Sequence, residues 1–153
     1  MKLIVAINNN GYIGKNGSML WKSSEDFKHF RKLTTGKGEG NILLVGKTTF
    51  ENDLKGKPLP NRDILVIGTG YNTLPGAVRR AYQKEQAANE MNKSVDIWVI
   101  GGASIYTNLI HICSEIHMSI IDDNSIGDVS FVVPDSYRGD IITYNFEPNK
   151  PII

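Results

Sequence analysis

Short apolar runs rich in Ile, Leu and Val recur along this chain and restrict the folds that it can adopt. Each run is bounded by Gly or polar residues. Continuous apolar runs of this kind suit strands that are covered on both faces, as in a parallel sheet. We expect strands at residues 3–7, 42–45, 64–67, 97–100 and 116–121.

Segments with helical character lie between these runs. Residues 76–92, for example, are rich in Ala, Gln and Glu, which favour helices. We expect helices at 24–33, 48–52, 76–92 and 104–112. Because strands and helices alternate, the chain is predicted to form an α/β fold with a mostly parallel central sheet flanked by helices.

The pattern changes after Asp128. Residues 129–133 and 141–144 both have strand character, and no helix is expected between them. This predicts an antiparallel edge at the carboxyl-terminal end of the sheet. Pro148 and Pro151 follow, and since proline cannot donate a ladder hydrogen bond, the sheet should end before them.

Composition and charge limit the class of protein. The 153 residues suit one domain spanning 1–153. The net charge is +1, without a long run of one sign, so neither a nucleic acid nor a membrane surface is an expected partner. The lone Cys113 fits a reducing compartment, and the apolar amino terminus is too short for a signal peptide, so we expect a cytoplasmic protein.

Gly46-Lys47-Thr48-Thr49 follows one predicted strand and precedes a short helix. Backbone N–H groups at a helix start, a cation and hydroxyls together can bind a phosphate. The segment is not a P-loop, because residue 41 is Asn where that motif requires Gly. A plain helix cap with a solvated Lys47 explains the segment equally well.

Gly101-Gly102 also joins a predicted strand to a helix. Paired glycines allow a ligand to approach the backbone closely. Taken alone, the pair favours a tight strand-to-helix connection over a ligand site, and the Rossmann glycine pattern is absent.

Asp26 is the strongest candidate for chemistry. Helical spacing places it on one face with Phe27 and Phe30. A carboxylate beside aromatic rings suits substrate recognition or proton transfer. The alternative is that Ser23 and Asp26 form a capping box, which the local pattern alone favours.

Arg62 follows the turn Pro58-Leu59-Pro60, and its planar guanidinium could bind a ligand carboxylate. A solvated pair with Asp63 is the alternative. The histidines and Cys113 lack metal-ligand spacing, and no Gly-x-Ser-x-Gly segment is present. We therefore expect neither a metal site nor acyl-transfer chemistry.

Taken in order, these segments resemble dihydrofolate reductase from residue 3 to about residue 133. The resemblance depends on Ile4-Val5-Ala6, Ile13-Gly14, Leu20-Trp21 with Asp26 and Phe30, Thr34, Val45-Gly46-Lys47-Thr48-Thr49, Pro58-Leu59-Pro60 with Arg62, Ile100-Gly101-Gly102 with Tyr106, and Gly127-Asp128. It implies hydride transfer from NADPH to the pterin ring of dihydrofolate, giving tetrahydrofolate, while the neighbouring ring nitrogen gains a proton.

The resemblance also implies roles for single residues. Asp26 would accept hydrogen bonds from the amino-pyrimidine edge of the pterin and favour its protonation through a water near Trp21. Asp26 would be the only acid in the pocket, with a pKa raised by desolvation. Arg62 would bind the carboxylate of the substrate tail, and Thr34 would support either Arg62 or the helix end. The implied substrate contacts are Ile4, Ala6, Phe27, Phe30, Leu59, Arg62, Ile100 and Ser119.

The implied cofactor contacts surround the two glycine-containing turns, and the Gly101–Gly102 peptide bond would be cis. Residues 9–21, with Gly11, Gly14 and Gly17, would form a mobile lid. The implied cofactor contacts are Ala6, Ile13, Met19, Gly46, Lys47, Thr48, Thr49, Thr69, Gly101, Gly102, Ala103, Ser104, Ile105 and Tyr106.

The chain departs from the family pattern at several positions. Lys47 replaces a common Arg, so a compact ammonium group stands where a planar guanidinium could form two parallel hydrogen bonds with a phosphate. Leu20 stands where the family commonly has Pro, and Ser119 stands where it commonly has Thr. Residues 53–57 form an insertion. The chain stops about one strand short of a typical member, so the final hairpin is expected to be shortened. We expect a monomer, with association through that edge as the alternative.

Two other functions remain open. The related pyrimidine reductase of riboflavin synthesis also uses NADPH, although Asp26 beside Trp21 and Phe30 favours folate. A folate- or nucleotide-binding structural protein is the second alternative. Antifolate inhibitors are expected ligands in the reductase interpretation.

Overall fold

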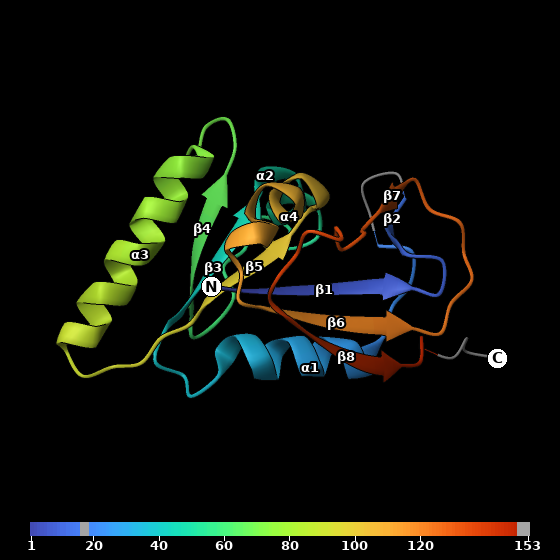
Figure 1. Cartoon of the computed structure of the whole chain (residues 1–153), viewed down its shortest axis with the longest axis horizontal. Coiled ribbons are helices and arrows are strands. Elements are labelled where there is room, and N and C mark those ends of the chain that lie inside the picture. The colour runs from blue at the N-terminus through green and yellow to red at the C-terminus, as the bar shows by residue number, and fades with distance from the viewer. Residues whose placement is uncertain (16–18, 150–153) are drawn as a thin grey trace.

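Parallel strands form the central sheet of the computed structural model, which describes residues 1–15 and 19–149 (Figure 1). The sheet has six strands in the order β4-β3-β5-β1-β6-β8, and every neighbouring pair is parallel. The strands are β1 (Lys2–Asn8), β3 (Asn41–Gly46), β4 (Arg62–Ile67), β5 (Ile97–Gly101), β6 (Glu115–Ile121) and β8 (Asp140–Phe146). Two short strands, β2 (Tyr12–Gly14) and β7 (Val129–Ser130), pair antiparallel.

Helices cover both faces of this sheet, which confirms the predicted α/β class. Helices α3 and α4 pack on the face that includes Leu3 and Leu44, whereas Phe30 and Leu33 of α1 pack on the face that includes Ile4 and Leu43. Successive side chains of a strand point to opposite faces, so burial of both faces requires continuous apolar runs. The helices are α1 (Ser24–Thr35), α2 (Lys47–Asn52), α3 (Leu74–Glu90), α4 (Ala103–Leu109) and the short 3-10 helix η1 (Ile110–Ile112).

The predicted antiparallel edge is wrong for residues 141–144. Strand β8 runs parallel to β6 along its whole length, from Glu115 beside Asp140 to Ile121 beside Phe146 (Figure 1). The connection after β7 returns the chain to the start of β6, where the Tyr137 hydroxyl donates to the carbonyl of Cys113 at 2.9 Å. A strand that starts at the same end as its neighbour is necessarily parallel to it.

The remaining expectations for this end of the chain have mixed outcomes. Antiparallel pairing does occur at Val129–Ser130, but its partner is β2 and not β8. The sheet ends at Phe146, before Pro148, as predicted. Pro151 lies outside the described residues.

Strands β1 and β5 separate near their carboxyl ends. Their paired register contains Lys2 with Trp98 and Leu3 with Val99. Beyond this point the buried Tyr106 hydroxyl, from α4, lies 2.7 Å from the carbonyl oxygen of Ile4 and 3.0 Å from that of Ile100, and donates to both. The hydroxyl thus bridges the two strands where the gap opens, and ligands of α/β sheets bind at such carboxyl ends.

A second polar cluster joins α1, β6 and β8. His117 Nδ1 lies 3.1 Å from the Tyr144 hydroxyl, and His117 Nε2 lies 3.2 Å from Glu115 Oε1. His29 packs on Tyr144 with ring centroids 4.1 Å apart. Burial lowers the pKa of both His29 and His117 below the ordinary value of 6.5, although Asp26 and Glu115 respectively oppose this effect.

We predict that Tyr106→Phe lowers the free energy of unfolding by about 1–3 kcal/mol, because two buried carbonyls lose their shared donor. Urea denaturation measures this change. Tyr82→Phe is the matched control, since Tyr82 is 44% exposed on α3. Equal unfolding midpoints for the two variants would show that the Tyr106 bridge contributes no stability.

We predict that His29 and His117 make the protein less stable in acid. Their folded-state pKa values are lowered, so the unfolded state binds protons first. Above pH 6.5, the ordinary pKa of histidine, both histidines are neutral in the folded and unfolded states, and their full contribution to stability is present. As the pH falls from 6.5 through their lowered folded-state pKa values, the unfolded state gains protons first and the free energy of unfolding decreases. Denaturation across a pH series should therefore show a flatter acid dependence for the double variant His29→Gln/His117→Gln. The exposed His111, changed to Gln, is the control, and a wild-type slope in the double variant would contradict the prediction.

Candidate functional site

Two adjoining cavities lie at the carboxyl ends of β1, β3 and β5. The larger has a volume of about 550 Å³ and the smaller about 320 Å³. They share one wall, which is therefore the place where two ligands would touch. The shared wall consists of Val5, Ala6, Met19, Thr49, Asp53, Ile100 and Tyr106.

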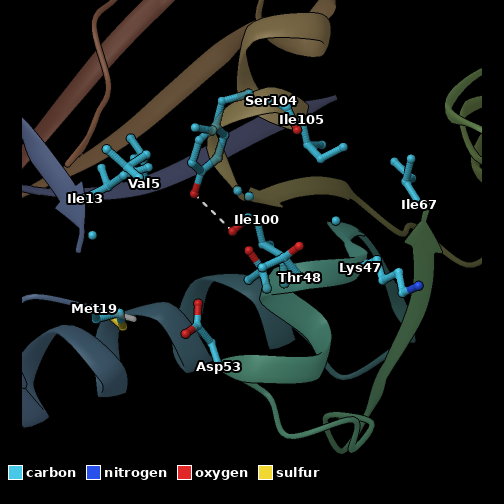
Figure 2. Close-up of a pocket in the computed structure, with 18 of the residues that line it drawn as sticks. Val5, Ile13, Met19, Lys47, Thr48, Asp53, Ile67, Ile100, Ser104 and Ile105 are labelled. Atoms are coloured by element: carbon cyan, nitrogen blue, oxygen red, sulfur yellow. Dashed lines mark hydrogen bonds between the residues drawn. The ribbon is translucent and has the colours of Figure 1, made fainter. Parts of the chain in front are cut away.

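The larger cavity brings together every predicted cofactor contact except Thr69 (Figure 2). Thr69 does not line the cavity, but its neighbour Gly68 does. The Gly101–Gly102 peptide bond is cis, as expected. Gly46 allows close packing, because a Cβ there would lie 3.1 Å from Ile105 Cγ1, a tight contact that Ile105 would have to relieve by moving.

The smaller cavity contains Asp26 among mainly apolar side chains. Asp26 is only 6% exposed. Burial raises its pKa above the ordinary value of 3.8, while a hydrogen bond from Ser119 and the charge of His29 partly oppose this. Of the predicted substrate contacts, those that line this cavity are Ile4, Ala6, Phe27, Phe30, Leu59 and Ile100.

The other predicted substrate and catalytic residues lie outside the cavity lining. Ser119, on β6, does not line the cavity, but its side chain forms a hydrogen bond with Asp26. Trp21 is buried, and its indole N–H has no partner among the described residues. Arg62 Nη1 donates to the Thr34 hydroxyl at 3.0 Å. The alternative pairing of Arg62 with Asp63 is not found in the described chain, since Asp63 pairs with Lys84 at 2.6 Å.

The helix cap and the cavity use different atoms of Asp26. Its backbone N–H donates to Ser23 Oγ at 3.3 Å, which caps α1, while its side chain lines the cavity. The carboxyl-terminal segment also holds this helix start, because Asn149 Oδ1 accepts from the Ser24 N–H at 2.8 Å. The sequence pattern gave no indication of this contact, which joins residues far apart in the chain.

Asp26 is not the only acid here, contrary to expectation. Asp53 lines both cavities and lies at the end of α2, where its N–H donates to the Thr49 carbonyl at 2.9 Å. Burial raises the pKa of Asp53, and Lys55 partly opposes this. Its spacing of four residues from Thr49 indicates a shared helix face and could have identified it. Sequence analysis also missed Lys15 in the larger cavity and Leu54 in the smaller one.

The described part of the predicted lid is tied to the chain after β6, because Asn8 Nδ2 donates to the Ser125 carbonyl at 2.7 Å and Asn10 Nδ2 donates to the Asn124 carbonyl at 3.1 Å. Asn8 is buried, and its Oδ1 accepts from the N–H groups of Asn10 and Tyr12, both at 3.0 Å. Met19 lines both cavities. Gly17 lies outside the described residues. The mobility of the lid stays a prediction.

Within residues 1–15 and 19–149, no group of three or more His, Cys, Asp or Glu side chains could hold a metal ion. The same residues include no helix with the length and apolar character needed to span a membrane.

Comparison with known proteins shows the family to which this chain belongs. The family model described as dihydrofolate reductase matches residues 1–147. A dihydrofolate reductase of Buchnera aphidicola (from Schizaphis graminum) is 33% identical over 131 residues, covering 86% of this chain and 78% of that protein. Dihydrofolate reductase HdrB of Haloferax volcanii is 28% identical over 145 residues, covering 90% and 72% respectively. The dihydrofolate reductase of Bacillus subtilis is 28% identical over 131 residues, covering 86% and 74%. The chain therefore belongs to the dihydrofolate reductase family of oxidoreductases.

Proposed function

We propose that this protein reduces dihydrofolate to tetrahydrofolate with NADPH. The observation that carries the proposal is the buried carboxyl of Asp26 in a small apolar cavity that adjoins a larger, glycine-walled cavity. One cavity can hold a flat ring with polar edges, and the other can hold a dinucleotide. Their shared wall allows the two ligands to meet.

The donor set of the larger cavity fits NADPH. Lys15 and Lys47 supply positive charge, and Thr48 and Thr49 supply hydroxyl groups. The glycines at both turns leave backbone N–H groups open to phosphate oxygens. In Figure 2, Lys47 points toward the end of β4, away from Asp53. We assign Lys47 to binding of the 2′-phosphate of NADPH. Thr69 lies next to the lining residue Gly68, so we assign the end of β4 to binding of the adenosine part of NADPH.

When bound, NADPH would supply the hydride, and the chain would supply the substrate orientation and the proton. A buried carboxyl with a raised pKa can accept hydrogen bonds from the amino groups of a pterin edge. It would also favour transfer of a proton, through water, to the adjacent ring nitrogen. The unpartnered indole N–H of Trp21 supports a role in holding that water.

Arg62 is assigned to the carboxylate of the substrate tail. Its bonds to Thr34 Oγ1 and to the Pro60 carbonyl, both at 3.0 Å, fix the guanidinium near the cavity wall that includes Leu59. The guanidinium has five N–H donors, so it can still bind a carboxylate. Thr34 also donates to the Phe30 carbonyl at 2.8 Å and so supports the helix end as well.

We extend the proposal to the whole molecule. The larger cavity uses elements from β1 to β7 and the smaller one uses elements from β1 to α4, which supports a single functional domain over residues 1–153. Antifolates that resemble the pterin edge should compete for the smaller cavity. The buried free thiol of Cys113 supports a reducing, cytoplasmic setting. We propose that the protein acts as a monomer, with association through β8 as the alternative.

Asp26→Asn is expected to lower turnover at neutral pH by a factor on the order of 10²–10⁴, because an amide cannot exchange a proton in this way. The measurement is loss of NADPH absorbance on adding dihydrofolate. Wild-type activity should fall as the pH rises through the raised pKa of Asp26, and the variant should lack this titration. Glu25→Gln, at the exposed neighbouring position, is the control. If wild type binds NADPH tightly without turnover, the structural-protein alternative gains support.

Lys47→Ala is expected to weaken NADPH binding roughly tenfold while leaving NADH binding almost unchanged, because only NADPH carries the 2′-phosphate. Lys47→Arg should keep or increase the preference for NADPH, since Arg adds a bidentate fork. Calorimetric titration of each dinucleotide measures both effects. Lys57→Ala, at an exposed position outside both cavities, is the control. Equal weakening of both dinucleotides would argue against the assignment of Lys47.

A further inference from the structure

Asp53 is the charged side chain on the wall that the two cavities share. The other residues of that wall in the described chain are apolar or carry only a hydroxyl group. Asp26, by comparison, lines only the smaller cavity, and Lys47 lines only the larger one. A ligand group at the shared wall would therefore lie closer to the charge of Asp53 than to the other charges of the site.

The end of α2 fixes the position of Asp53. Its N–H donates to the Thr49 carbonyl at 2.9 Å, and the helical spacing of four residues places both side chains toward the cavities. Figure 2 shows the Asp53 carboxylate on the side of the site occupied by Met19, while Lys47 extends from the opposite end of α2. Lys47 and Asp53 thus lie at opposite ends of α2, and Lys15 adds a second positive charge to the lining of the larger cavity.

The carboxylate of Asp53 is free to interact with a ligand. Within the described residues, no hydrogen bond or ion pair engages its oxygens. Burial raises the pKa of Asp53. Asp26 and Asp53 both raise the pKa of the Tyr106 hydroxyl, whose largest perturbation is its own burial. Both acids therefore lie close enough to the Tyr106 hydroxyl to disfavour its ionisation.

The proposed function determines which ligand group reaches this wall. Hydride transfer requires reacting atoms to approach to about 3–3.5 Å, so the cofactor and substrate rings must meet where the cavities join. Bound NADPH would supply a hydride, that is, hydrogen with the electron pair of its C–H bond, to a substrate carbon. A proton joins the neighbouring substrate nitrogen. The nicotinamide ring, neutral before transfer, is then a cation.

We propose that Asp53 is a specificity-determining residue that favours the oxidised, cationic nicotinamide ring over the reduced, neutral ring. This inference rests on the proposed function. An ionised carboxylate attracts the cation, and it contributes little to binding of the neutral ring. Since Asp53 is exposed to solvent, water and salt limit the effect to a modest factor.

The test compares dissociation constants of NADP⁺ and NADPH for the full chain, measured by titration at a pH well above the range of carboxyl groups. In Asp53→Asn the ratio of the NADP⁺ constant to the NADPH constant should rise roughly three- to tenfold over wild type. The difference should shrink in high salt. Asn is compatible with a helix end, and Asp53→Ser repeats the test if the first variant is unstable.

Glu51→Gln is the matched control. Glu51 belongs to the same helix, is exposed, and lines neither cavity, so its removal changes net charge equally. The ratio should stay at the wild-type value in this variant. An equal rise in both variants would assign the effect to net charge and overturn the role of Asp53.

The remaining outcomes separate the two proposals. If wild type binds both dinucleotides and reduces dihydrofolate, but Asp53→Asn leaves the ratio unchanged, the role of Asp53 is overturned and the proposed function stands. If folded wild type binds neither dinucleotide, both proposals are overturned.

Discussion

The bridge from the Tyr106 hydroxyl to the carbonyls of Ile4 and Ile100 is the interaction on which the site depends. Parallel strands that separate lose their ladder hydrogen bonds, and a buried carbonyl without a partner is costly. One hydroxyl from α4 satisfies both strands where they part. The gap between β1 and β5 can therefore open without exposing unpaired backbone, and both cavities begin there.

The rest of the fold keeps this gap in place. Apolar side chains cover both faces of the sheet, so β1, β3 and β5 cannot shift in register without moving their side chains to the wrong face. The helix that carries Asp26 is held at its start by Ser23 and Asn149. A rigid frame of this kind allows charged groups to be placed at defined points around the site.

Charge is distributed along the site according to the part of the ligand that each end would meet. Lys47 lies at the far end of the larger cavity, Asp53 at the junction, and Asp26 in the smaller cavity. Burial raises the pKa values of both acids, but Asp26 is buried whereas Asp53 is exposed to solvent, so water screens the charge of Asp53 more. A dinucleotide with anionic phosphates in the larger cavity and a ring with a hydrogen-bond donor edge in the smaller cavity match this order.

Local patterns were sufficient for much of this description. Apolar runs predicted the sheet and its layers because burial of both faces requires them, and the resemblance identified Asp26 and the glycine turns. The direction of β8 was not predictable, because it depends on where the loop anchored by Tyr137 returns the chain. The four-residue spacing from Thr49 could place Asp53 on a shared helix face, but its position on both cavity walls was decided by tertiary structure. Those walls come from elements far apart in sequence, and only packing determines which side chains face the same space.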